Sequence, residues 1–153
     1  MLFLGLDPGK SGGIVVLLEG GALDRTLALE RSTEADVAIF LAGLSPLERR
    51  LAFCEKISPF PGQGASSRAK LSESYGFLRG VLTTLGFERR FVAPQVWQRA
   101  MGCLSGGYKR VTKARAEEIW PGEKWTHALA DAALIAEYGR RQWRAQERTP
   151  GDV

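Results

Sequence analysis

The chain opens with MLFLGLDPGKSGGIVVLLEGG, residues 1–21, and this stretch decides the fold. Apolar side chains fill positions 1–6 and 14–18, and a segment rich in glycine separates the two runs. Short apolar runs bounded by Gly, Pro and Asp are typical of strands joined by a turn. A further run at 22–30 follows the glycine turn at 19–21. The first third of the chain therefore predicts a meander of three antiparallel strands.

The remaining sequence predicts two more strands and several helices. Cap residues, prolines and the spacing of apolar side chains mark where these elements begin and end. They are a helix from 32–35 to Pro46, a buried strand over 51–57, a helix over 66–85, a short strand over 91–93, helices over 94–101 and 109–120, and a helix from the Thr126 cap to about Trp143. The predicted order is β-β-β-α-β-α-β-α-α-α, in one domain.

Length and composition indicate one compact domain. The chain has 153 residues, 44% of them hydrophobic, and a chain of this size buries roughly 70% of its unfolded surface. We expect neither a membrane span, which needs about 20 apolar residues, nor a signal peptide, because the opening run lacks a basic flank. Two cysteines and a single histidine supply neither a disulfide framework nor an ordinary zinc site. We therefore expect a soluble intracellular protein.

The charge is positive and unevenly distributed. Lys and Arg outnumber Asp and Glu by 21 to 17, which gives a net charge of +4. Residues 1–60 carry 6 basic and 8 acidic side chains, whereas residues 61–153 carry 15 and 9. A basic C-terminal part indicates a polyanionic partner, although a solvated helical surface has the same composition. Arg49 and Arg50 are predicted to be merely solvated.

Three carboxylates occupy positions that an apolar core would avoid. Asp7 ends the first strand, Glu55 lies in the second buried strand, and Asp131 falls inside an apolar helix. Burying an ionised carboxylate costs several kcal/mol unless a partner compensates it. Taken singly, each has a structural explanation: a turn at Asp7, an ion pair of Glu55 with Lys56 or an arginine, and solvation of Asp131.

The predicted strand arrangement brings these carboxylates together. Strands one and four can lie side by side, which puts Asp7 next to Glu55, and the last helix can present Asp131 to both. His127 precedes Asp131 by one helical turn and shares its helix face. Clustered hard oxygen ligands suit Mg²⁺ or Mn²⁺. Two such ions, roughly 3.5–4 Å apart, can promote phosphodiester cleavage.

The glycine-rich segment does not match a phosphate-binding loop. Residues 5–11 read GLDPGKS, but Leu4 stands where the first glycine of that motif belongs, and the interval from Gly5 to Gly9 is one residue short. The segment also joins two predicted hairpin strands rather than a strand and a helix. We therefore expect no nucleotide cofactor.

An ordered set of motifs resembles the RuvC-type Holliday junction resolvases, nucleases with an RNase H-like fold. The resemblance runs from residue 2 to about residue 141, and some of its motifs are most similar to bacteriophage members. The family motifs are FLGLDPG at 3–9, CEK at 54–56 and HALADAAL at 127–134, and the bacteriophage-like ones are PGQG at 61–64, SYGFLRG at 74–80 and LIAEYGRR at 134–141.

This resemblance implies the architecture and the activity. The fold would be α/β and RNase H-like, with a mixed five-stranded sheet in the order 3-2-1-4-5, flanked by helices. A single nuclease domain would cover residues 1–145, followed by a polar tail at 146–153. The family implies a homodimer that binds a four-way DNA junction and cuts two strands symmetrically, leaving 5′-phosphate ends. It would act in the cytoplasm, or in the host cytoplasm for a bacteriophage protein, without a membrane partner.

The resemblance also assigns metal ligands. Asp7, Glu55 and Asp131 would hold two divalent ions, Mg²⁺ or Mn²⁺, in each active site. His127 stands where many relatives have aspartate and some have histidine. We expect neutral His127 to act in catalysis as a metal ligand or to position the attacking water, and to favour Mn²⁺ over Mg²⁺.

Other site assignments concern DNA. A lysine near the scissile phosphate would offset charge on the phosphate oxygens; Lys109 is the first candidate and Lys113 the second, the alternative being an ordinary surface lysine. Phe60 would stack on an unpaired base, worth ~1–3 kcal/mol, or else pack between its neighbouring prolines. The candidate DNA contacts are Phe60, Arg68, Lys70, Arg79, Arg99, Arg110, Lys113 and Arg115.

The helix over 66–85 is the candidate dimer element. Part of its apolar face must serve the core, and the rest is free to contact a second copy. A two-fold dimer would match the two-fold symmetry of a junction. The apolar residues are Leu71, Phe77, Leu78, Val81 and Leu82.

Three other functions stay open at this point. The same fold could cut flaps, loops or RNA-containing hybrids. A non-catalytic nucleic-acid-binding scaffold is less consistent with an intact acidic set. A sugar-kinase or actin-like ATPase also carries Asp and glycines in its first hairpin, but it needs two such domains, and 153 residues supply one.

Overall fold

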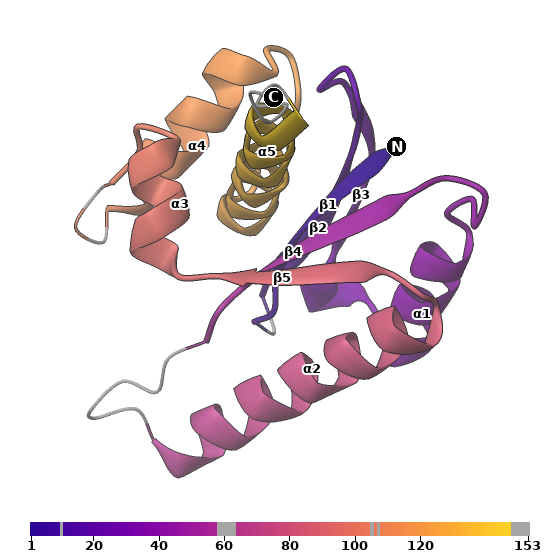
Figure 1. Ribbon diagram of the computed structural model, residues 1–153. Helices are drawn as coiled ribbons and strands as arrows, with labels where there is room; N and C mark the ends of the chain where they lie inside the picture. The colour runs from indigo at the N-terminus through magenta and orange to yellow at the C-terminus, as the bar shows by residue number, and fades with distance from the viewer. Residues whose placement is uncertain (10, 58–63, 105, 107, 148–153) are drawn as a thin grey trace.

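Figure 1 shows the computed structural model, which describes residues 1–9, 11–57, 64–104, 106 and 108–147. The elements follow the predicted order, with a 3-10 turn added after the third strand. They are β1 (Leu2–Asp7), β2 (Gly13–Leu18), β3 (Leu23–Ala28), η1 (Leu29–Arg31), α1 (Glu34–Ala42), β4 (Arg50–Glu55), α2 (Ala65–Thr84), β5 (Glu88–Val92), α3 (Pro94–Ala100), α4 (Lys109–Ile119) and α5 (His127–Glu147). None of the helices described here has the length and apolar character that a membrane crossing requires.

The strands form one mixed sheet. Its order is β3-β2-β1-β4-β5, with β1–β2 and β2–β3 antiparallel and β1–β4 and β4–β5 parallel. The predicted 3-2-1-4-5 order is therefore confirmed. In the β1–β4 register Leu6 lies opposite Cys54, so that Asp7 and Glu55 end adjacent strands at the same edge of the sheet.

Helices cover both faces of the sheet, as Figure 1 shows. Phe3, Leu51 and Phe53 pack with α3, α4 and α5 in one hydrophobic cluster, whereas Leu4 and Leu6 pack with α1 and α2 in the other. Side chains alternate between the faces along each strand. Asp7 thus shares the face of Phe3, and Glu55 shares that of Phe53, which directs both carboxylates toward α5.

Helix α5 lies unusually close to the sheet because glycine and alanine line the contact. A Cβ atom at Gly5 of β1 would overlap the backbone of Ala132, and one at Gly139 would overlap the ring of Phe53. Ala132 and its neighbour Ala133 are fully buried. This close approach sets Asp131, one residue before Ala132, beside the end of β1.

Several element boundaries differ from the prediction; α1 ends at Ala42 rather than at Pro46, and β4 ends at Glu55 rather than at 57. The third strand ends at Ala28, because η1 turns the chain there and Leu29 N donates to Gly12 O at 3.0 Å. Strand β5 begins at Glu88 rather than at 91, since it is an edge strand whose first residues are polar and only half-buried. Helix α5 continues past Trp143 to Glu147. Of the expected tail at 146–153, the first two residues belong to α5, and residues 148–153 lie outside the described part of the chain.

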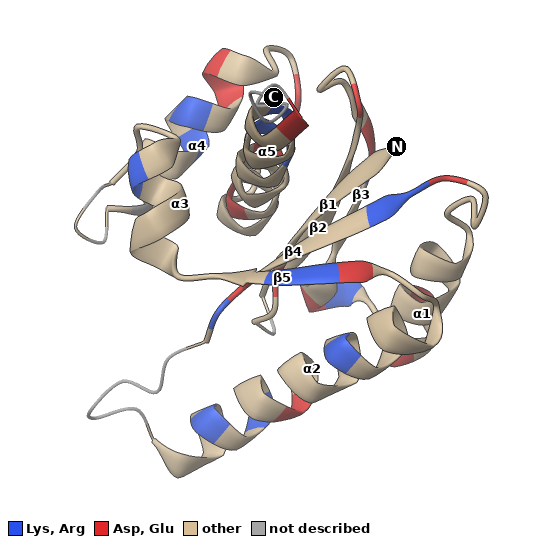
Figure 2. Cartoon of the chain, in the orientation of Figure 1, with Lys and Arg blue, Asp and Glu red and all other residues tan. Residues whose placement is uncertain are grey.

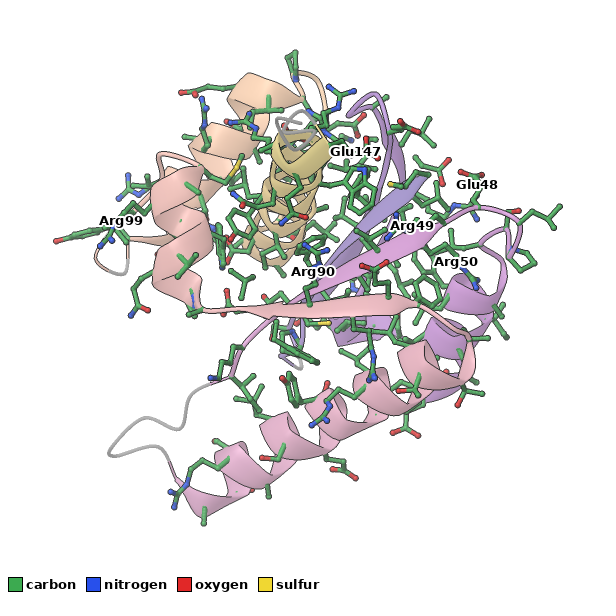
Figure 3. All side chains as sticks on the ribbon, viewed as in Figure 1. Glu48, Arg49, Arg50, Arg90, Arg99 and Glu147 are labelled. Carbon is green, nitrogen blue, oxygen red and sulfur yellow. The ribbon has the colours of Figure 1, made fainter. Side chains whose placement is uncertain are left out.

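The prediction that Arg49 and Arg50 are merely solvated is wrong. Arg50 is half-buried, donates to Leu85 O at 2.6 Å and lies over the Phe87 ring. Arg49 donates to the Glu88 carboxylate at 2.7 Å and lies over the ring of Trp143. Figure 3 labels both arginines at the start of β4. Their long side chains cover apolar surface while their charged groups find partners.

Candidate active site

Three carboxylates meet at the sheet edge where β1 and β4 end. Asp7 and Glu55 come from these strands, and Asp131 comes from the second turn of α5, whose cap Thr126 accepts from Leu129 N at 3.2 Å. Burial is the main reason that the pKa of Glu55 rises from 4.5 to about 7. The negative charges of Asp7 and Asp131 raise this pKa further. The charges of Asp7 and Asp131 thus act on Glu55, as expected for carboxylates that lie close together.

A cavity of about 370 Å³ opens at this edge. Asp7, Asp131 and His127 line it, together with Glu30 of η1. His127 is exposed, whereas Asp131 Oδ1 is almost completely shielded from solvent. Glu30 carries no signal in the sequence, because it falls in a stretch that reads as a continuation of β3.

The turn after Asp7 fixes the mouth of this cavity. Gly12 N donates to Gly9 O at 2.8 Å, and a side chain at Gly12 would overlap the backbone of Asp7. Ser74 of α2 donates its hydroxyl to Pro8 O at 2.7 Å. The segment joins two antiparallel strands, in agreement with its rejection as a phosphate-binding loop.

The partner of Glu55 is a residue that the sequence did not indicate. Trp97 of α3 donates its indole Nε1–H to Glu55 Oε2 at 2.8 Å, and this hydrogen bond opposes the rise in the Glu55 pKa. Trp97 is completely buried, while Lys56 is exposed. The suggested ion pair of Glu55 with Lys56 or an arginine is therefore replaced by a neutral donor.

The donor set fits a divalent cation with a strong preference for oxygen. Carboxylates that raise one another's pKa gain stability when a cation neutralises them. Within the described part of the chain, no group of three or more His, Cys, Asp or Glu side chains forms a ready-made metal cage. Mg²⁺ does not need one, because it is held by one or two carboxylates, waters and substrate phosphates. Asp7, Glu55 and Asp131 match that requirement.

The other predicted residues are spread over helices on both faces of the sheet, and Figure 2 shows their charges. Lys70 lines a second cavity beside Gly9, and Arg79 lies over the rings of Tyr75 and Phe91. Arg68, Lys70 and Arg79 lie on α2, Arg99 on α3, and Arg110, Lys113 and Arg115 on α4.

Two residues of α4 are already engaged within the chain. Arg115 donates to Met101 O at 3.0 Å and to Glu118 at 2.6 Å. Lys113 lies 3.9 Å from Glu117. Lys109 begins α4, but its side chain is outside the described part of the chain, as is Phe60.

The apolar face of α2 serves mainly the core. Leu78 and Leu82 are buried, and Phe77 and Val81 pack partly against the same cluster. Leu71 is half-buried. The α2 residues of this cluster all come from the carboxyl-terminal half of the helix, whereas the amino-terminal half extends beyond the sheet in Figure 1.

Comparisons with known proteins place the fold. No protein-family model matches the sequence, and no curated protein sequence matches it. The structure of Thermus thermophilus RuvC in complex with Holliday junction substrate is 17% identical, covers 95% of this chain and 96% of that one, and superposes with a TM-score of 0.69. A second Thermus thermophilus RuvC structure, also 17% identical, gives 0.62 over 95% and 97% of the two chains. The chain therefore has the RNase H-like fold of RuvC, as its sequence motifs predicted.

Proposed function

We propose that the chain is a metal-dependent endonuclease that resolves four-way DNA junctions by paired, symmetric nicks. The convergence of Asp7, Glu55 and Asp131 at the open edge of the sheet carries this proposal. The fold supports it, because a RuvC structure of the same architecture is a complex with Holliday junction substrate. The positive net charge of +4 is consistent with a polyanionic substrate.

Asp7, Glu55 and Asp131, with His127, would hold two Mg²⁺ or Mn²⁺ ions. When bound, such ions activate water and stabilise the leaving oxygen of a phosphodiester. The chain's own residues set the geometry. The turn at Gly9 and Gly12 fixes Asp7, and the close seating of α5 on β1 fixes Asp131.

DNA binding is proposed to use the basic helices. Arg68, Lys70 and Arg79 on α2 and Arg99 and Arg110 on α3 and α4 would contact phosphates. Lys109, or Lys113, would face the scissile phosphate, and Phe60 would stack at the crossover. If about six phosphates are neutralised, log affinity should fall with log salt with a slope near −5. A slope shallower than about −2 would reject an extended footprint.

The second active site that symmetric cutting needs would come from a homodimer. The amino-terminal half of α2, around the half-buried Leu71, is the proposed contact. Each protomer would then cut one of two symmetry-related strands. Sedimentation of the free protein should give twice the monomer mass, and a monomer on DNA would contradict this arrangement.

The test is cleavage of a synthetic immobile four-way junction, a flap, an RNA–DNA hybrid and a linear duplex with Mg²⁺ or Mn²⁺. Wild type should make paired nicks on the junction with 5′-phosphate ends, and Asp7→Asn should bind the junction without cutting it. Preference for the flap or the hybrid would support a nuclease of another specificity on the same fold. Tight junction binding without cutting under either metal would indicate a scaffold instead.

A further inference from the structure

We propose that Trp97 is a positioning residue for the active site: its buried indole N–H holds one oxygen of Glu55 and so fixes the orientation of this carboxylate beside Asp7 and Asp131. The contact is 2.8 Å between Trp97 Nε1 and Glu55 Oε2. This inference rests on the proposed metal-dependent function. It adds a role for a side chain that carries no charge and binds no metal.

The pairing of β4 with β5 places Trp97 next to Glu55. Glu55 is paired with Val92 in the parallel β4–β5 register, and α3 begins two residues later at Pro94. Proline at the first helical position fixes where the helix starts. Trp97 follows within the first turn of α3 and therefore lies above the end of β4.

Packing fixes the side chain of Trp97 in place. Its side chain is 0% exposed and belongs to the cluster between the sheet and α5. The far end of α3 is also held, because Met101 is buried and its carbonyl accepts from Arg115 at 3.0 Å. A rotamer locked by packing at both ends of a short helix is what a precise hydrogen-bond donor requires.

The chemistry of indole suits this task. Its N–H donates and cannot accept, so that it always presents a proton to the carboxylate. Held by one oxygen, Glu55 cannot rotate freely and keeps its second oxygen available. Partners that orient metal ligands in this way typically contribute 10–100-fold in metal affinity.

A purely structural role makes a different prediction, and the chain offers a matched control. Trp120 is also buried, lies in the same cluster and donates its indole N–H to Gly21 O at 2.9 Å. Gly21 belongs to the β2–β3 turn, at the opposite end of β2 from the turn that follows Asp7. Replacing either indole by phenyl removes one buried hydrogen bond, but only Trp97→Phe acts on Glu55.

The experiment measures Mn²⁺ binding in the absence of DNA, by loss of the free-ion EPR signal, for wild type, Trp97→Phe and Trp120→Phe. Wild type and Trp120→Phe should bind Mn²⁺ equally, and Trp97→Phe should bind about 10-fold more weakly. Equal binding by both variants would overturn the role of Trp97. No Mn²⁺ binding by wild type at millimolar metal would instead refute the proposed function.

A second measurement does not require a folded variant. The chain has four tryptophans, so a ¹⁵N correlation spectrum contains few indole N–H signals. The spectrum of Trp97→Phe assigns the signal of Trp97. If this variant fails to fold, a triple-resonance experiment on wild type gives the assignment. Titration of wild type with Mg²⁺ should shift this signal, while that of Trp120 stays in place. An unmoved Trp97 signal under saturating Mg²⁺ would also overturn the proposal.

Discussion

The seating of α5 on β1 can be tested by adding one methyl group at Gly5. A Cβ atom there would overlap Ala132 O and lie 2.5 Å from Ala136 N and 2.9 Å from Ala132 C. All three are backbone atoms, so no side-chain rotation relieves the overlap. In Gly5→Ala the helix must therefore move away from the strand, which costs about 1–3 kcal/mol or more.

The expected consequence is a loss of both stability and activity. For a domain of this size, each kcal/mol lowers Tm by about 2–4 °C, so Gly5→Ala should lower Tm by about 2–12 °C. A displacement of ~1 Å between Asp131 and Asp7 should reduce junction cleavage about 100-fold.

The matched control is Gly80→Ala in α2, where an added Cβ meets nothing within 4 Å. Alanine should raise helix stability there by about 0.4–1 kcal/mol. Thermal unfolding by circular dichroism and junction cleavage give both readouts. If Gly5→Ala unfolded at the same temperature as wild type and kept its cleavage rate, the proposed close approach of α5 and β1 would be refuted.

Three further predictions concern single charged or titratable groups. Burial raises the pKa of Glu55 to about 7 in the folded protein, against about 4.5 in the unfolded chain. The metal-free protein should therefore lose up to about 3 kcal/mol of stability as the pH rises from 4.5 through 7. Denaturant titrations in EDTA should show this loss for wild type and not for Glu55→Gln. Glu137 is 2% exposed and pairs with Arg140 and Arg141. In the same titration, Glu137→Gln should lower the free energy of unfolding by about 3–5 kcal/mol. Glu118→Gln, which breaks an exposed pair with Arg115, should lower it by less than about 1 kcal/mol. His127→Asp should shift the preferred metal from Mn²⁺ toward Mg²⁺ in junction cleavage, and identical rates with the two metals before and after the change would contradict a role of His127 at the ions.

The fold could be predicted because its signals are local. The apolar runs on either side of the Asp7 turn specify the β1–β2 hairpin, and a continuous apolar run specifies β4 as a central strand. Once β1 and β4 are neighbours, their register puts Asp7 and Glu55 at one edge. Gly5 also carried a usable signal, since glycine inside a strand often marks the close approach of another backbone.

The remaining features depend on contacts between distant segments. Trp97 and Glu55 are 42 residues apart in the sequence, and the residues next to each of them do not indicate that the two form a hydrogen bond. Arg50 reads as a surface charge, yet its partner is a carbonyl 35 residues away at Leu85. The start of β5 cannot be predicted from apolar residues, because an edge strand paired on one side does not need the apolar pattern of a buried strand.

An anomalous diffraction map of crystals soaked in Mn²⁺ tests the proposed metal site most directly. Two Mn²⁺ peaks, roughly 3.5–4 Å apart, are expected at the edge where β1 and β4 end. Oxygens of Asp7, Glu55 and Asp131 should be within about 2.0–2.5 Å of these peaks. Mn²⁺ bound elsewhere, with this edge empty at saturating metal, would contradict the claim that these three carboxylates form the catalytic centre.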